Sequence, residues 1–254
     1  MTIMARSLDG REIEPHTCVF PILKEVDSET NQMIGTGFFI TNIGHFVTAK
    51  HVIEDIFIFE KKKQKAAIHA VHFVEGSKVL VRHITKIFPS ETSDLVVGKM
   101  DFHVRNDTGR PLHNLVPQFT TTPPPIGSPV VTFAYPGTDK IFKRGNSSTF
   151  VAGYFEGKVL EHSEVLRDKA LVKWPFYATS IDVKGGASGG PVYDYKGRVI
   201  GVNCVGGLGD LSYMARANEL LELRVPEFPV NPSAHPDGPS VHELMKLGAI
   251  KFAT

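Results

Sequence analysis

The sequence predicts an all-β protein, and three features point to it. Short apolar stretches recur along the chain, each bounded by glycine, proline, asparagine or aspartate, which is typical of strands joined by turns. No repeat occurs at the periods of solenoids or propellers. A length of 254 residues suits one large β unit or two small barrels packed together. The pattern therefore favours barrels or a sandwich.

The strands can be placed one by one from their apolar residues. Residues 37–40 and 45–49 indicate two strands, and the Thr-Asn-Ile-Gly segment between them indicates a hairpin turn. Further strands are expected at residues 67–74, 78–87, 94–100, 129–135, 148–159, 177–181, 191–195 and 199–204.

Proline and a few apolar spacings define the other segments. Three consecutive prolines at 123–125 cannot lie inside a central strand, so the surrounding residues indicate a stiff linker. Leucines near 218–223 predict a helix with Asn218 as its N-cap. Beyond residue 226 the chain is rich in proline, serine and histidine, which indicates an extended tail with a short helix near 241–247.

Composition excludes several classes of protein. The hydrophobic fraction of 42% and charged fraction of 22% are ordinary for a globular domain. A formal net charge of +1 gives no reason to expect nucleic acid or an anionic membrane as a partner. The basic run at residues 61–65 indicates a solvated loop. No apolar stretch approaches the roughly 18 residues that span a bilayer.

The cysteines and the first residues indicate a compartment. The chain has two cysteines, Cys18 and Cys204, and its first ten residues lack the apolar run of a secretory signal. A secreted protein of this size would more often carry several disulfides. We therefore expect a cytoplasmic protein in which both cysteines are small buried thiols.

The segment 185–191, Gly-Gly-Ala-Ser-Gly-Gly-Pro, carries the strongest chemical signal. A nucleophilic serine needs exposure and backbone N–H groups aimed at a developing oxyanion. Glycines around Ser188 permit the tight turn that presents those groups. The alternative is a plain glycine-rich turn.

Two more residues complete a candidate set. His51 follows the strand at 45–49, and imidazole is a suitable general base for a serine hydroxyl. Asp94 opens an apolar strand, a position from which a carboxylate can be buried against imidazole Nδ1. Each is weak alone, because most of the eleven histidines serve no chemistry and an aspartate before a strand is usually a turn residue.

Together these motifs resemble the trypsin/chymotrypsin superfamily of serine proteases. The order His51, Asp94, Ser188 is the chymotrypsin order, with the motifs Thr-Ala-Lys-His, Ser-Asp-Leu and Gly-Ala-Ser-Gly-Gly-Pro. The segments 35–40, 127–137, 197–203 and 214–221 resemble the disulfide-free HtrA/Deg-like branch.

The resemblance implies a fold and a domain plan. It implies two packed antiparallel six-stranded β-barrels with a short C-terminal helix and the site in the cleft between them. The expected parts are an N-terminal extension at 1–14, a first barrel at 15–115, a linker at 116–125, a second barrel with a closing helix at 126–225, and a tail at 226–254.

The resemblance also implies roles for residues around the triad. It gives the oxyanion hole to the backbone N–H groups of Gly186 and Ser188. It places the specificity pocket along two segments, and Asp182 matches the aspartate that gives trypsin its preference for lysine and arginine. The implied substrate-binding residues are Asp182, Val183, Lys184, Asn203, Cys204, Val205 and Gly206.

Several departures from the family limit what it implies. Ala187 stands where zymogen-activated trypsins have an aspartate, so that activation route is not expected. The residues after Gly201 are too few for the PDZ domain of HtrA proteins. Restraint by a closed cleft, by the tail, or by an activating or inhibitory protein partner is therefore expected.

Three classes of function remain open. The first is a trypsin-like endopeptidase acting on protein or peptide substrates, the second a non-enzymatic binding module on the same fold, and the third an esterase or other acyl transferase. No metal and no cofactor are expected, because His-Glu-x-x-His, paired cysteine motifs and glycine-rich nucleotide loops are absent from the sequence.

Overall fold

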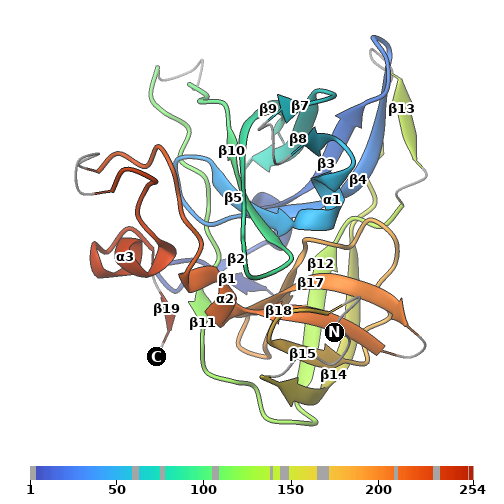
Figure 1. The fold of residues 1–254 in the computed structure, drawn as a ribbon, viewed down its shortest axis with the longest axis vertical. Helices are drawn as coiled ribbons and strands as arrows, with labels where there is room; N and C mark the ends of the chain where they lie inside the picture. Colours follow the sequence, from blue (N-terminus) through green and yellow to red (C-terminus); the bar gives the residue numbers. More distant parts are fainter. Residues whose placement is uncertain are drawn as a thin grey trace.

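Two closed six-stranded antiparallel β-barrels are stacked on each other in the computed structural model (Figure 1). The structure describes residues 4–58, 63–74, 78–104, 109–137, 140–143, 149–164, 172–208, 211–230, 235–250 and 252–253. Blue and green strands form the first barrel at the top of Figure 1, and yellow and orange strands form the second below it. The all-β double-barrel prediction is confirmed.

The first barrel has the strand order β4-β3-β8-β9-β10-β5 and closes by pairing of β4 with β5. Its strands are β3 (Val19–Glu25), β4 (Thr30–Phe39), β5 (His45–Ala49), β8 (Ile68–Val74), β9 (Lys78–Pro89) and β10 (Leu95–Met100).

The second barrel has the order β16-β12-β14-β15-β18-β17 and closes by pairing of β16 with β17. Its strands are β12 (Pro129–Ala134), β14 (Gly153–Ser163), β15 (Phe176–Thr179), β16 (Pro191–Tyr193), β17 (Val199–Leu208) and β18 (Leu211–Arg216).

Short elements connect and brace the barrels. β13 extends from the second half of the chain and pairs with β4 of the first barrel, Ile141 opposite Gln32. β11 pairs in parallel with β17 and with β19. The short elements are β1 (Ala5–Arg6), β2 (Glu12–Ile13), β6 (Phe57–Ile58), β7 (Lys63–Gln64), β11 (Phe119–Thr120), β13 (Ile141–Lys143), β19 (Phe252–Ala253), and helices η1 (Pro15–Thr17), α1 (Lys50–Glu54), α2 (Ala217–Leu221) and α3 (Val241–Lys246).

Aromatic side chains fill the first barrel. The rings of Phe39 and Phe46 lie 4.8 and 5.4 Å from that of Phe20, and all three are fully buried. Phe38 contacts Phe119 outside this group at 6.1 Å. Each buried phenylalanine contributes about 2 kcal/mol through loss of apolar surface from water, so the barrel is a stiff support for side chains at its rim.

Most expected strands occur, with shifts that have physical reasons. β4 and β5 form the predicted hairpin, with Phe38 opposite Val47. β14 begins at Gly153, not at residue 148, because its partner β12 ends at Ala134, opposite Gly153. β3 was not predicted, and it contains Pro21. That proline is tolerated because pairing with β8 starts one residue later, at Ile22.

One helix prediction was wrong in its boundary. Arg216, not Asn218, is the N-cap of α2. The reason is that β18 runs through Arg216 directly into the helix. The second predicted helix is α3, where Ser240 and Glu243 form a capping box. The basic run at 61–65 falls mostly outside the described residues.

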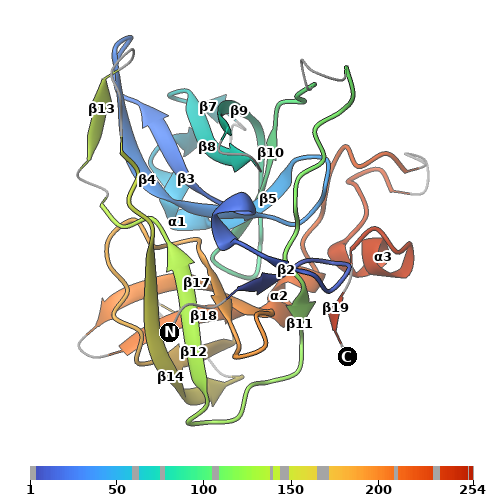
Figure 2. The ribbon, with the colours of Figure 1, turned by 180° about the vertical axis from the view of Figure 1, so that it is seen from behind.

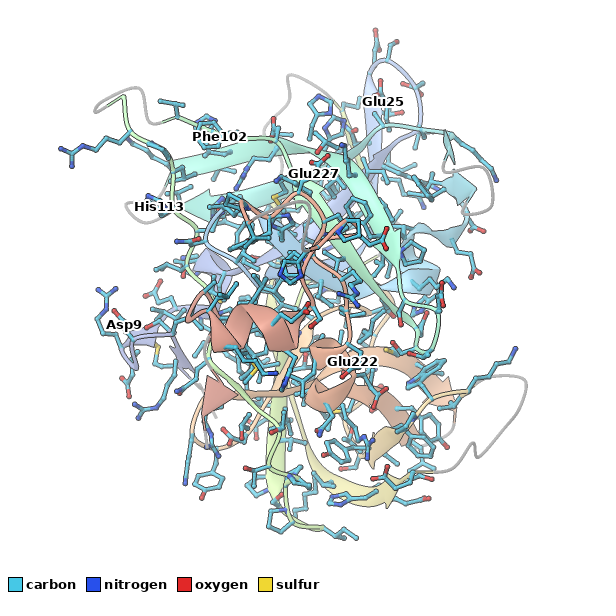
Figure 3. The ribbon with its side chains drawn as sticks, turned by 60° about the vertical axis from the view of Figure 1, so that its left-hand side comes forward. Asp9, Glu25, Phe102, His113, Glu222 and Glu227 are labelled. Carbon is cyan, nitrogen blue, oxygen red and sulfur yellow. The ribbon has the colours of Figure 1, made fainter. Side chains whose placement is uncertain are left out.

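The tail packs on the body of the protein. Figure 3 shows the segment that carries Glu227 lying across the outside of the first barrel, where Glu227 pairs with Lys86. Val241 and Leu244 of α3 are buried. Among the described tail residues, none lines the cavity that holds His51 and Ser188.

A buried histidine joins the tail to the first barrel. His45 has no exposed surface, and its Nε2 lies 2.9 Å from the carbonyl oxygen of Pro226. Because a carbonyl only accepts, Nε2 carries the proton. Nδ1 lies 3.1 Å from Thr41 Oγ1. Burial, aided by the charge of Lys99, lowers the pKa of His45 to about 4.

This burial predicts a pH-dependent stability. Between pH 6.5 and about 4, His45 is protonated in the unfolded chain but stays neutral in the folded chain. The free energy of unfolding therefore decreases as the pH falls through this range. We expect His45→Gln to flatten this dependence by up to about 1.4 kcal/mol per pH unit. Urea unfolding from pH 7 to 4 measures it. His113→Gln, at an exposed position, is the control, and an equal slope in both variants would contradict the assignment.

Candidate active site

The strand pairing of the first barrel brings His51 and Asp94 together. β5 and β10 are antiparallel, with Ala49 opposite Leu95, so the end of one strand meets the start of the other. His51 then lies in the first turn of α1. Its Nδ1 is 2.6 Å from Asp94 Oδ2, and its backbone N–H donates to Asp94 Oδ1 at 3.1 Å.

This contact fixes the chemical state of the imidazole. The carboxylate of Asp94 is 11% exposed, whereas the His51 side chain is 40% exposed. A carboxylate at Nδ1 holds the proton there and leaves Nε2 as the acceptor. The arrangement supplies a general base beside a solvent-accessible space.

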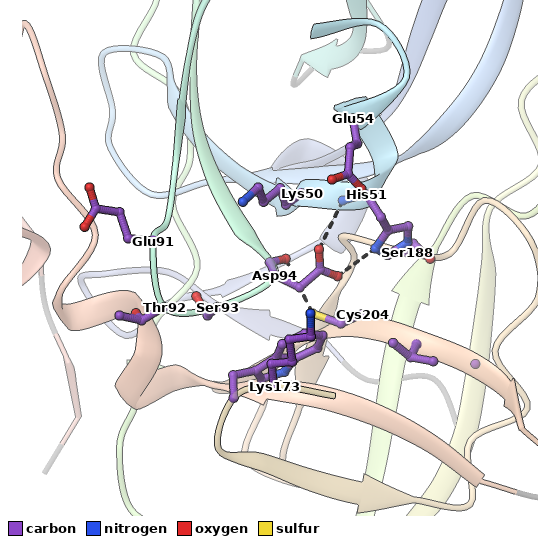
Figure 4. Close-up of a pocket in the computed structure, with 13 residues that line it drawn as sticks. Lys50, His51, Glu54, Glu91, Thr92, Ser93, Asp94, Lys173, Ser188 and Cys204 are labelled. Atoms are coloured by element: carbon purple, nitrogen blue, oxygen red, sulfur yellow. Dashed lines mark hydrogen bonds and ion pairs between the residues drawn. The ribbon is translucent and has the colours of Figure 1, made fainter. Parts of the chain in front are cut away.

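Ser188 reaches this space from the second barrel. Figure 4 shows the close-up of a cavity of about 930 Å³. The residues that line it are Lys50, His51, Glu54, Glu91, Thr92, Ser93, Asp94, Lys173, Trp174, Ser188, Cys204, Val205 and Gly206. Within the described part of the chain, no hydrogen bond yet joins Ser188 to His51.

The loop before Ser188 admits only glycine at position 186. Gly186 has φ +94°, and a Cβ there would lie 2.6 Å from the carbonyl oxygen of Tyr135 and 2.9 Å from the nitrogen of Gly137. A side chain would force the loop away from the second barrel. Neither Gly186 N–H nor Ser188 N–H donates to a backbone carbonyl of the described residues, which leaves both N–H groups for a ligand.

A buried threonine ties this loop to the first barrel. Thr36 on β4 is 0% exposed. Its N–H donates to the carbonyl oxygen of Ser188 at 2.9 Å, and its Oγ1 donates to that of Gly186 at 2.8 Å. The same Oγ1 accepts from the N–H of Tyr135 at 3.1 Å. Its carbonyl accepts from Thr48 Oγ1 at 2.7 Å. Sequence reasoning missed Thr36.

The expected substrate-binding residues fall into three places. Cys204, Val205 and Gly206 line the cavity with Ser188. Asn203 is buried, and its amide donates to Thr132 Oγ1 at 2.6 Å inside the second barrel.

The remaining expected residues lie on the opposite segment, outside the cavity lining. Asp182 is 76% exposed and pairs with Lys184. Val183 packs on Gly206, since a Cβ on Gly206 would lie 2.7 Å from Val183 Cβ. The two segments therefore touch, and Asp182 is not enclosed at the base of a pocket.

Cys204 is held in its thiol form. It is 2% exposed, and burial, with the charge of Asp94, raises its pKa well above the usual value. Its Sγ lies 3.8 Å from the carbonyl oxygen of Asp94. A protonated thiol is a poor nucleophile. The Cys204 side chain therefore serves as packing behind Asp94.

No cluster of three or more His, Cys, Asp or Glu residues that could hold a metal ion occurs among the described residues. No helix in the same ranges is long and apolar enough to cross a membrane.

Comparisons with known proteins identify the family and the fold. A family model for the trypsin-like peptidase domain matches residues 35–202. No curated protein matches the chain.

Solved structures share the fold. Deg5 is 19% identical, with a TM-score of 0.58, over 80% of this chain and 85% of that chain. The active form of the Rv3671c protease from M. tuberculosis is 19% identical, with a TM-score of 0.56, over 94% and 84% of the two chains. An HtrA-type protease, AlgW, with a bound tripeptide, is 15% identical, with a TM-score of 0.54, over 80% and 57%.

The family match spans well over half of the chain, from β4 of the first barrel to β17 of the second. The chain therefore belongs to the trypsin-like peptidase family and is a serine protease, a hydrolase of peptide bonds.

Proposed function

We propose that the protein is an endopeptidase that cleaves polypeptides through an acyl-enzyme on Ser188. The observation that carries this proposal is the 2.6 Å contact of Asp94 with Nδ1 of His51 in the cavity that Ser188 also lines. A cavity of about 930 Å³ has room for several residues of an extended peptide, which favours cleavage within a chain.

The steps follow from the groups present. His51 Nε2 takes the proton of the Ser188 hydroxyl while the oxygen attacks the scissile carbonyl. The N–H groups of Gly186 and Ser188 bind the oxyanion, a contribution of about 3 kcal/mol per donor. His51 then gives its proton to the leaving amine, Asp94 stabilises the imidazolium throughout, and water hydrolyses the acyl-enzyme by the same steps.

A latent resting state is part of the proposal. Its support is the missing hydrogen bond between Ser188 and His51 among the described residues. Substrate or a protein partner would bring these two side chains together and complete the site. A cytoplasmic location and such a partner remain predictions from the sequence.

The first prediction concerns the nucleophile. Ser188→Ala should lower hydrolysis of casein by at least about 10⁴-fold, because the acyl-enzyme cannot form, and should abolish labelling by a fluorophosphonate. Ser93→Ala removes another hydroxyl from the same cavity and should keep both.

The outcomes separate the candidate functions. Labelling of Ser188 without turnover of peptides but with turnover of esters would favour an esterase. A latent enzyme would also resist the label, so an unlabelled Ser188 favours a binding module only where casein is present and stays uncleaved. Labelling that survives Ser188→Ala would contradict the proposed nucleophile.

The second prediction concerns cleavage preference. The sequence indicated lysine or arginine before the cleaved bond, but an exposed Asp182 paired with Lys184 and Val183 against Gly206 favour a small aliphatic residue. Val183→Gly should therefore widen the accepted set toward larger side chains in a peptide library. Asp182→Asn should change cleavage after valine less than about twofold. A library cleaved only after lysine or arginine, and lost in Asp182→Asn, would restore the basic preference.

A further inference from the structure

A second cavity of about 440 Å³ lies between the two barrels and shares no lining residue with the first. Figure 2 shows β8 in the upper barrel and β12 and β14 in the lower barrel, the strands that carry the lining residues Phe73, Phe133 and Tyr154. The residues that line it are Met4, Glu14, His16, Phe73, Phe133, Tyr135, Phe150, Ala152 and Tyr154.

Five aromatic rings line this cavity, and they contact one another both edge to face and stacked. Phe133 meets Tyr154 at 5.0 Å and 61°, and Tyr135 at 5.8 Å and 81°. Phe73 stacks on Tyr135 at 5.9 Å and 8° and meets Phe150 at 6.3 Å and 74°. The five rings border one volume, and electron-rich ring faces attract cations within about 6 Å.

The charge at the cavity has one sign. Glu14 is the carboxylate among the described lining residues, and they include no lysine or arginine. Its Oε2 lies 3.3 Å from His16 Nε2, and both side chains are partly exposed. Burial, with the charge of Glu14, raises the pKa of Tyr154, so the carboxylate acts on the hydroxyl of this lining residue. An aromatic box with a carboxylate at its edge is complementary to an organic cation that is too weakly hydrated to prefer water.

Tyr135 connects this cavity to the loop at residues 185–190 that carries Ser188, the nucleophile loop. Its ring forms a wall of the box, while its N–H donates to Thr36 Oγ1. Its carbonyl oxygen occupies the space that a Cβ at position 186 would need, at 2.6 Å. Two residues later, Gly137 N–H donates to the carbonyl oxygen of Gly185 at 2.7 Å. A ligand that holds the Tyr135 ring therefore steadies the backbone that supports the oxyanion hole.

We propose that this aromatic cavity binds a small methylated-ammonium molecule of the choline type, and that its occupancy stabilises the nucleophile loop in its reactive arrangement. The binding site stands on the cavity alone, whereas its effect on the loop rests on the proposed protease function. The ligand touches rings from both barrels, so it also braces one barrel against the other.

Calorimetry at pH 8 on the full chain tests the binding. Choline is the probe, and its uncharged carbon analogue, 3,3-dimethylbutan-1-ol, has the same shape. We expect choline to bind about tenfold more tightly, because only the cation gains from the ring faces and Glu14. Glu14→Gln and Tyr154→Leu should each weaken choline binding several-fold. Glu12→Gln, an exposed carboxylate outside the cavity, should leave it unchanged.

The labelling rate of Ser188 by a fluorophosphonate tests the coupling. Saturating choline should raise it several-fold in the wild type and not in Tyr154→Leu. Equal affinity for choline and its carbon analogue, or no binding of choline, would overturn the site. Binding with an unchanged labelling rate would overturn the coupling. Choline binding to a protein that is never labelled would support the site and contradict the protease mechanism instead.

Discussion

The hydrogen bonds of Thr36 hold the two halves of the site in one place. His51 and Asp94 belong to the first barrel and Ser188 to the second, so their approach depends on contacts across the barrel interface. Thr36 makes three such contacts from one buried position, to Ser188, Gly186 and Tyr135. A buried polar group that loses its partner costs about 1–3 kcal/mol, so the nucleophile loop cannot leave this position cheaply.

The same contacts explain why the loop needs its glycines. Gly189 has φ +84°, and a Cβ there would lie 2.1 Å from Thr48 Oγ1 and 2.2 Å from the carbonyl oxygen of Thr36. The loop thus presses its backbone against the threonines of the first barrel, and side chains would separate the surfaces. Backbone packing positions Ser188, and its own side chain is left to line the cavity.

The strands and the site motifs could be predicted from the sequence, because both depend on residues that are neighbours along the chain. The short apolar stretches predicted an all-β fold and the family resemblance implied two barrels, while the motifs around His51 and Ser188 named residues that the fold brings to one cavity. The sequence could not reveal Thr36, because that role depends on partners 150 and 99 positions away. The environment of Asp182 was equally hidden, since it follows from the path of two loops and the nearby Lys184.

The most direct test of this account compares Thr36→Val with Thr36→Ser. Valine keeps the shape and removes the hydroxyl that joins Gly186 to Tyr135, whereas serine keeps the hydroxyl. The account predicts that Thr36→Val lowers kcat/KM for peptide hydrolysis by about 10²-fold, as expected when an oxyanion donor is misplaced, and that Thr36→Ser retains most activity. Activity of Thr36→Val equal to that of the wild type, at a temperature where both are folded, would contradict it.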